Sequence, residues 1–215
     1  MQIPEQAKLL FIGDSITDAG RDPSGEPTPW ANDAGLGHGY VNLVNALLQT
    51  RQSDSRIRIL NQGVSGNTIR DLSARWQAHV LDLEPDWLSV KIGINDVWRQ
   101  FDQPGRVHAH VLPDEFETTY RRLLAQTRPQ VEGLVLISPY FIEPNRQDPM
   151  RARMDAYGAI VRKLAHEFEG RFVDAQAAMD RLAERMHPTE IAEDRVHPTT
   201  VGHMAIATAF LDAVD

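Results

Sequence analysis

The chain alternates short apolar runs with longer segments in which apolar residues recur every three or four positions. The first run, KLLFIG, is apolar almost throughout, and four later runs have the same character. Short apolar runs bounded by turn residues are typical of buried β-strands. The sequence therefore predicts strands over 8–13, 57–63, 87–93, 133–139 and 171–176.

Each predicted strand is followed by a segment with the spacing of an amphipathic helix. The expected helices cover 40–50, 68–83, 114–127, 150–168, 177–186 and 198–213. Thr68 and Asp71 fit a capping box at the start of the second helix. Pro198 suits the first turn of the last helix, whose inward residues are expected to be Val201, Met204, Ala205, Thr208 and Leu211.

This alternation predicts an α/β fold with a five-stranded parallel sheet between two layers of helices, in flavodoxin-like order. We expect residues 1–215 to form a single domain, since 215 residues suffice for one substantial core. In such sheets the ligand site lies beyond the carboxyl ends of the strands. The chemistry should therefore be sought where the predicted strands end.

Composition narrows the function classes. The net charge of −8 argues against nucleic-acid binding, which requires a basic surface. The chain has no cysteine, so disulfides, thiolate metal sites and a cysteine nucleophile are excluded. No apolar run has the length of a membrane span, and the N-terminus does not resemble a signal peptide. We expect a cytoplasmic protein that binds no membrane.

Polar residues cluster at the predicted strand ends. The first strand leads into Gly13-Asp14-Ser15, the second into 61–67, the third into 93–96 and the fourth into 138–141. Two long connections, 19–39 with Trp30 and 99–113 with His108 and His110, are expected to form functional walls or subunit contacts. An ordinary turn would also explain Gly13-Asp14-Ser15.

Ser15 becomes a candidate nucleophile if a base lies nearby, because a serine hydroxyl is unreactive at neutral pH. The base is usually a histidine that a carboxylate orients. Asp194 stands three residues before His197, so a turn would bring its carboxylate to the imidazole. Glu184 and His187 have the same spacing in a similar segment. Only the segment with Asp194 and His197 leads into the long final helix. We therefore predict the triad Ser15, Asp194 and His197.

A serine nucleophile also requires donors for the oxyanion of the tetrahedral intermediate. We expect the backbone N–H groups of Ser15 and Gly66 and the side-chain amide of Asn95 to form this oxyanion hole. Glycine allows a backbone to approach a substrate closely, and an asparagine amide donates without titrating.

Several residues near the predicted triad and oxyanion hole have more than one possible role. Asp14 and Asp96 are expected to hold loop backbone in place, with or without a part in chemistry, and Asp18 to cap a helix. Candidate substrate contacts are Asp14, Trp98, Arg99 and Tyr140. Tyr140 and Phe141 are each compatible with a pocket lining or with a core position. His108 and His110 lack an obvious third ligand for a metal. His79, His166 and His203 are expected to be surface or cap residues.

The motif set as a whole resembles the SGNH (GDSL) hydrolases: GDS, NxGxSG, GxND and DxxH, within 11–18, 61–68, 92–98 and 194–203. The stretches LLFIGDSITD, IGINDVWRQ and DRVHP resemble those of bacterial intracellular acetyl xylan esterases. The resemblance implies the SGNH hydrolase fold, the roles given above, no cofactor or metal, and a homo-oligomer. It implies removal of acetyl groups from xylo-oligosaccharides.

The sequence thus predicts a serine esterase that acts on a small-molecule ester. Alternatives are an esterase, lysophospholipase or thioesterase for other esters, or a non-catalytic carbohydrate-binding relative. A flavodoxin-like nucleotide binder would require a phosphate-binding glycine motif after the first strand, and none is present there.

Overall fold

The five predicted strands form one sheet in which all neighbouring strands run parallel. The computed structural model describes residues 3–24, 33–51 and 55–215. The order across the sheet is β2-β1-β3-β4-β5, so the predicted α/β fold and its flavodoxin-like order are confirmed. The strands are β1 (Lys8–Gly13), β2 (Arg58–Gly63), β3 (Trp87–Lys91), β4 (Gly133–Ile137) and β5 (Arg171–Val173).

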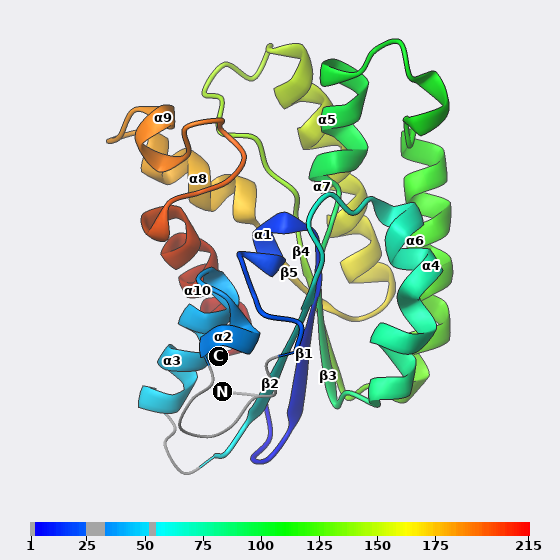
Figure 1. Cartoon of the computed structure of the whole chain (residues 1–215), viewed down its shortest axis with the longest axis vertical. Helices are drawn as coiled ribbons and strands as arrows, with labels where there is room; N and C mark the ends of the chain where they lie inside the picture. The colour runs from blue at the N-terminus through cyan, green and yellow to red at the C-terminus, as the bar shows by residue number, and fades with distance from the viewer. Residues whose placement is uncertain (1–2, 25–32, 52–54) are drawn as a thin grey trace.

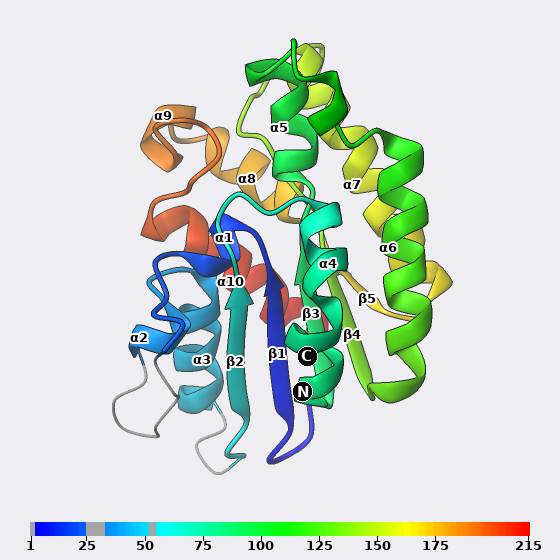
Figure 2. The same ribbon diagram turned by 45° about the vertical axis from the view of Figure 1, so that its right-hand side comes forward.

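Two layers of helices enclose the sheet (Figures 1 and 2). One layer contains α10 with α3 and α8 each packed against it, and the other contains α4, α6 and α7. The long helices are α3 (Tyr40–Arg51), α4 (Ile69–His79), α6 (Pro113–Thr127), α7 (Pro149–Glu167), α8 (Ala175–Ala183) and α10 (Thr200–Val214). Shorter helices are α1 (Ser15–Asp18), α2 (Asp33–Leu36) and α9 (Pro188–Ile191).

The core lies on both faces of the sheet. Leu9, Leu10, Phe11 and Ile12 of β1 are all 0% exposed, although alternate side chains point to opposite faces. A strand that is covered on both faces reads as a continuous apolar run, which is why the sequence located these strands. β1 lies between β2 and β3, so its end, which Asp14 and Ser15 follow, has a neighbouring strand on each side.

The sequence missed a helix, α5 (Ile94–Asp102), directly after β3. The third strand was expected to reach 93 but ends at Lys91. Gly93 has φ +128°, a conformation that other residues rarely adopt, and it turns the chain straight into α5. Helix α5 occupies the start of the expected loop 99–113, and α2 lies within the expected loop 19–39. Trp30 lies outside the described residues.

The face of α10 was predicted wrongly. Val201 and Met204 are 47% and 38% exposed, and of the five expected core residues only Leu211 is buried. The helix is apolar nearly all round, so its pattern does not distinguish one face from another. The buried face consists of Gly202, His203, Ile206, Ala207, Phe210, Leu211 and Val214.

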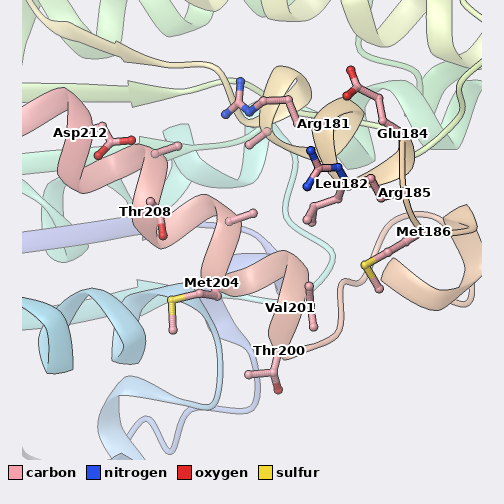
Figure 3. A pocket seen from close by; sticks show the side chains of 13 residues that line it. Arg181, Leu182, Glu184, Arg185, Met186, Thr200, Val201, Met204, Thr208 and Asp212 are labelled. Atoms are coloured by element: carbon pink, nitrogen blue, oxygen red, sulfur yellow. The ribbon is translucent and has the colours of Figure 1, made fainter.

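The outward face of α10 forms one wall of a groove of about 810 Å³, with α8 as the other wall (Figure 3). Val201, Met204 and Thr208 lie along it.

The start of α10 also differs from the prediction, because Thr199 is the N-cap and Pro198 precedes the helix. Among the described residues, no helix is long and apolar enough to cross a membrane. The cytoplasmic location stays a prediction.

Candidate active site

The ends of three adjacent strands gather the predicted site residues at one edge of the sheet. Gly13 at the end of β1 is paired in register with Gly63 of β2 and with Lys91 of β3. The segments that follow carry Ser15, Gly66 and Asn95. Figure 2 shows the arrowheads of β1 and β2 pointing towards the edge where α1 lies. The predicted location of the site, beyond the carboxyl ends of the strands, agrees with this arrangement.

The structure brings Ser15, His197 and Asp194 into direct contact. The Ser15 Oγ lies 2.8 Å from the His197 Nε2, and the His197 Nδ1 lies 2.6 Å from the Asp194 Oδ2. Asp194 therefore orients one ring nitrogen while the other faces the serine hydroxyl. This is the geometry of a Ser-His-Asp triad, in which the histidine can accept the serine proton.

Asp194 is held as a carboxylate by the turn that it shares with His197. Its Oδ1 accepts hydrogen bonds from the backbone N–H groups of Val196 (2.9 Å) and His197 (2.8 Å). Partial burial raises the pKa of Asp194, but the hydrogen bonds from the His197 side chain and these two N–H groups outweigh burial and hold the pKa below its usual range. Asp194 therefore stays ionised and fixes the ring of His197.

Two of the four expected substrate contacts lie beneath the site instead of facing it. Tyr140 is 0% exposed, and its hydroxyl donates to the backbone carbonyl of Val196 at 3.0 Å, next to His197. Asp14 is also 0% exposed and caps α1, accepting from the N–H of Ile16 at 3.0 Å. Neither side chain is exposed in the structure, and the role of Asp14 and Tyr140 as direct substrate contacts stays a prediction. Phe141 is likewise buried.

A buried lysine faces Asp14 under the nucleophile. The Lys91 Nζ lies 3.9 Å from the Asp14 Oδ1 and 4.9 Å from the centre of the Tyr140 ring, and both charged side chains are fully buried. Burial raises the pKa of Asp14 and lowers that of Lys91, while the attraction between the two opposes both shifts.

A Cβ on Gly13 would lie 2.3 Å from the carbonyl oxygen of Lys91, so only glycine fits before Asp14.

The three predicted oxyanion donors surround this strand edge. Gly66 has φ +82°, and the position of its missing Cβ opens onto free space. Among the described residues, no acceptor bonds the backbone N–H of Ser15 or of Gly66. Asn95 is 3% exposed, and its Nδ2 donates one hydrogen bond to the Asn67 carbonyl at 2.9 Å. The second N–H of this amide is therefore oriented and available for an oxyanion.

Asp18 and Arg75 support the site, and sequence reasoning missed both roles. Asp18 was expected to cap a helix, but its Oδ2 accepts from the N–H (3.1 Å) and the hydroxyl (2.7 Å) of Ser65, which ties α1 to the Gly66 loop. Arg75 of α4 donates to the carbonyls of Gly13 (2.9 Å) and Gln62 (2.8 Å) and to the Asn67 Oδ1 (2.7 Å). No local pattern signals an arginine that bonds distant carbonyls.

Trp98 and Arg99 of α5 border the triad. The ring centres of Trp98 and His197 are 6.0 Å apart, and Trp98 is half-buried. The Arg99 guanidinium lies 5.4 Å from the centre of the Trp98 ring and forms an ion pair with Asp102. These two residues thus stand where a substrate contact is possible, and that role stays a prediction.

Three other histidines have structural contacts of their own. His187, the alternative base, is exposed and caps α9 through its contact with Thr189. The His110 Nε2 contacts the Gln103 carbonyl, and the described residues contain no group of three His, Cys, Asp or Glu that could hold a metal ion. His203 was expected to be a surface or cap residue; it is only 8% exposed, and its Nδ1 accepts from the N–H of Tyr40, the first residue of α3, at 3.1 Å.

Comparisons with known proteins agree with this site. The model of the GDSL-like lipase/acylhydrolase family matches residues 11–205. An acetylxylan esterase from Geobacillus stearothermophilus is 50% identical over 212 residues, 98% of this chain and 95% of that protein. A crystal structure of an acetylxylan esterase from the same organism has a TM-score of 0.95 at 49% identity, covering 100% of this chain and 96% of that chain.

Two further similarities are informative. An alpha/beta hydrolase enzyme from the metagenome of Lake Arreo, Spain, has a TM-score of 0.95 at 51% identity, covering 100% of this chain and 97% of that one. Catalytic mutants of the Geobacillus esterase carry alanine in place of a serine, an aspartate or a histidine. The replaced aspartate and histidine are three positions apart in that protein, as Asp194 and His197 are here.

Proposed function

Because the chain belongs to the GDSL-like lipase/acylhydrolase family, we propose that it is a serine esterase that removes acetyl groups from acetylated carbohydrates, xylo-oligosaccharides foremost. Its family and its similarity to acetylxylan esterases make it a carboxylic ester hydrolase, and the substrate is the part that we propose. The observation that carries the proposal is the contact chain from Ser15 through His197 to Asp194 at the end of β1.

In the first half of the reaction, Ser15 attacks the ester carbonyl while His197 accepts the serine proton. Asp194 keeps the imidazole in position and stabilises the imidazolium that forms. His197 then gives its proton to the leaving oxygen of the sugar, the ester C–O bond breaks, and an acetyl-serine remains. In the second half, His197 removes a proton from the water that attacks the acetyl-serine, and returns it to the Ser15 oxygen as the acyl bond breaks and the acetate product leaves.

Both halves pass through a tetrahedral intermediate with a negatively charged oxygen. The backbone N–H groups of Ser15 and Gly66 and the free N–H of the Asn95 amide are the donors that we assign to it. Fixed donors stabilise this charge without reorganisation, and losing one costs about 3 kcal/mol of barrier height. Asn95 is held by Asn67, so its donor is fixed before substrate arrives.

The sugar side of the substrate is assigned to the surface around Trp98. Similarity to acetylxylan esterases supports an acetylated xylo-oligosaccharide. Trp98 presents an aromatic face beside His197, and sugar rings pack against such faces. The groove between α8 and α10 contains none of the triad residues, so it supplies no acyl channel for a lysophospholipase. A homo-oligomeric state stays a prediction.

The test compares acetate release from acetylated xylo-oligosaccharides with hydrolysis of activated acetate and octanoate esters. We expect acetate release from the sugar and a preference for acetate over octanoate. Hydrolysis of the activated acetate without release from the sugar would keep the esterase and reject the carbohydrate. A preference for octanoate would favour the lipase or thioesterase alternatives, and inactivity on all three substrates would favour a binding protein.

A further inference from the structure

The oxyanion donors Gly66 and Asn95 come from two different segments of the chain. Gly66 lies in the loop that leads into α4, while Asn95 is the second residue of α5. An oxyanion hole works only when its donors are held at a fixed separation. The structure must therefore contain contacts that hold the beginning of α4 against the beginning of α5.

One such contact is the hydrogen bond from the Asn95 amide to the Asn67 carbonyl. The other comes from the next residue, Asp96. Its Oδ1 accepts a hydrogen bond from the backbone N–H of Ile69, the first residue of α4, at 2.9 Å. Asn67 and Ile69 stand one and three positions after Gly66, so the two contacts attach the Gly66 segment to the start of α5 at two points.

Helix α4 does not require Asp96 as a cap. Thr68 is its N-cap, and Asp71 completes a capping box by accepting from the Thr68 N–H (2.8 Å) and hydroxyl (2.7 Å). Asp96 is a second acidic group at the same helix end, supplied from another element and 1% exposed. Its role is therefore a connection between α4 and α5.

The burial of the Asp96 carboxylate costs free energy of folding. The Asp96 Oδ2 has no hydrogen-bond partner among the described residues, and no lysine or arginine of that part of the chain forms an ion pair with Asp96. The charged groups that influence it are Asp14, Asp71 and Arg70, and the Tyr157 hydroxyl also senses its charge. An apolar side chain here would avoid burying a carboxylate but would leave the Ile69 N–H without its acceptor. What the position supplies is therefore this acceptor, which joins α5 to α4.

We propose that Asp96 is a positioning residue of the oxyanion hole, which holds the Gly66 loop against Asn95 through its bond to the Ile69 N–H. The inference rests on the proposed esterase function. Because the oxyanion exists only in the transition state and intermediate, loosening its donors should lower kcat and leave KM nearly unchanged.

The test begins with Asp96→Ala and Asp96→Asn, assayed on an activated acetate ester. Alanine removes the acceptor, and we expect kcat to fall by about tenfold to a hundredfold with KM within about threefold. Asparagine keeps an acceptor oxygen for the Ile69 N–H, so kcat should stay within about threefold of wild type. Thr127→Val is the matched control, because it removes a buried bond from Trp76 of α4 to α6 (2.8 Å) away from the site.

A second variant keeps the test decisive if Asp96→Ala does not fold. Ile69→Pro removes the N–H that Asp96 accepts, and proline is well tolerated at the first position of a helix. We expect a loss of kcat similar to that of Asp96→Ala. Because both act through one hydrogen bond, the double variant should lose little more than either single variant.

Each result has one meaning. A kcat within about twofold of wild type in both Asp96→Ala and Ile69→Pro would overturn the inference, as would losses of kcat matched by Thr127→Val. Additive losses for Asp96→Ala and Asn95→Ala would also overturn it, since residues of one unit are not additive. Wild-type inactivity on every ester would instead reject the proposed function, and the inference with it.

Discussion

Replacing Asp96 with asparagine should stabilise the protein more at pH 8 than at pH 5. Burial raises the pKa of Asp96 to about 7, and the charges of Asp14 and Asp71 add to this, while the N–H of Ile69 and the residue's own N–H oppose it. In the unfolded chain the carboxyl has its ordinary pKa of 3.8. The native state therefore binds the proton more tightly than the unfolded state does.

The sign and magnitude follow from linkage. A carboxyl with a raised pKa in the folded state contributes most stability below its unfolded pKa, and that contribution is lost as the pH rises through the folded pKa. Between these two values the loss is about 1.4 kcal/mol per pH unit, or about 4 kcal/mol in total. From pH 5 to pH 8 it amounts to about 2.5 kcal/mol, which corresponds to roughly 5 to 10 °C in Tm for a chain of this size.

The assay is thermal unfolding of wild type and Asp96→Asn at pH 5, 6, 7 and 8 in one buffer series. The difference in Tm, variant minus wild type, should grow with pH and level off above pH 7, because asparagine does not titrate. All other groups titrate in both proteins, so the difference isolates residue 96. A difference that is constant from pH 5 to pH 8 would show that Asp96 does not titrate in this window and would refute the reasoning.

Three further predictions concern the triad and its support. Asp194→Asn should lower kcat by about a thousandfold with little change in KM, because the imidazole loses its orienting carboxylate; an unchanged kcat in steady-state kinetics would remove Asp194 from the mechanism. His197→Ala should abolish ester hydrolysis while His187→Ala stays within about twofold of wild type, and the reverse result would assign the base to the other copy. Tyr140→Phe should lower the free energy of unfolding by about 1 to 3 kcal/mol, because the buried Val196 carbonyl loses its donor; an unchanged midpoint in urea would contradict this.

The strands could be predicted because burial on both faces leaves a clear mark in the sequence. The run in β1 is apolar from Leu9 to Ile12, β4 has no polar side chain, and the structure buries every residue of β4. Helix α5 was missed although Ile94, Val97 and Trp98 recur at helical spacing, because the expected strand was extended to Gly93 over its start. Its first turn also buries the polar residues Asn95 and Asp96, which a reading based on hydrophobicity assigns to a loop.

The orientation of α10 illustrates a different limit. Val201 and Met204 are as apolar as the residues that the helix buries, so periodicity could not select the face. His203 was expected to be a surface or cap residue; it is buried against Gly39 and accepts from the N–H of Tyr40, the first residue of α3. Only the tertiary structure shows which face meets the sheet.

The chemical residues were predictable, whereas their supports were not. Ser15, Asp194 and His197 stand in short motifs whose spacing expresses the geometry of the reaction. Asp18 and Arg75 act through bonds to the backbone of distant segments, and a carbonyl group carries no signature of its residue type. For that reason the sequence identifies the reacting groups better than the residues that hold them.

Ester hydrolysis by this protein depends most on Ser15 as the nucleophile. The most direct test is acetate release from acetylated xylo-oligosaccharides by wild type and by Ser15→Ala, with folding of both checked by their Tm. We predict rapid release by the wild type and none by the folded variant. Release by Ser15→Ala at a rate close to that of the wild type would contradict the proposed mechanism.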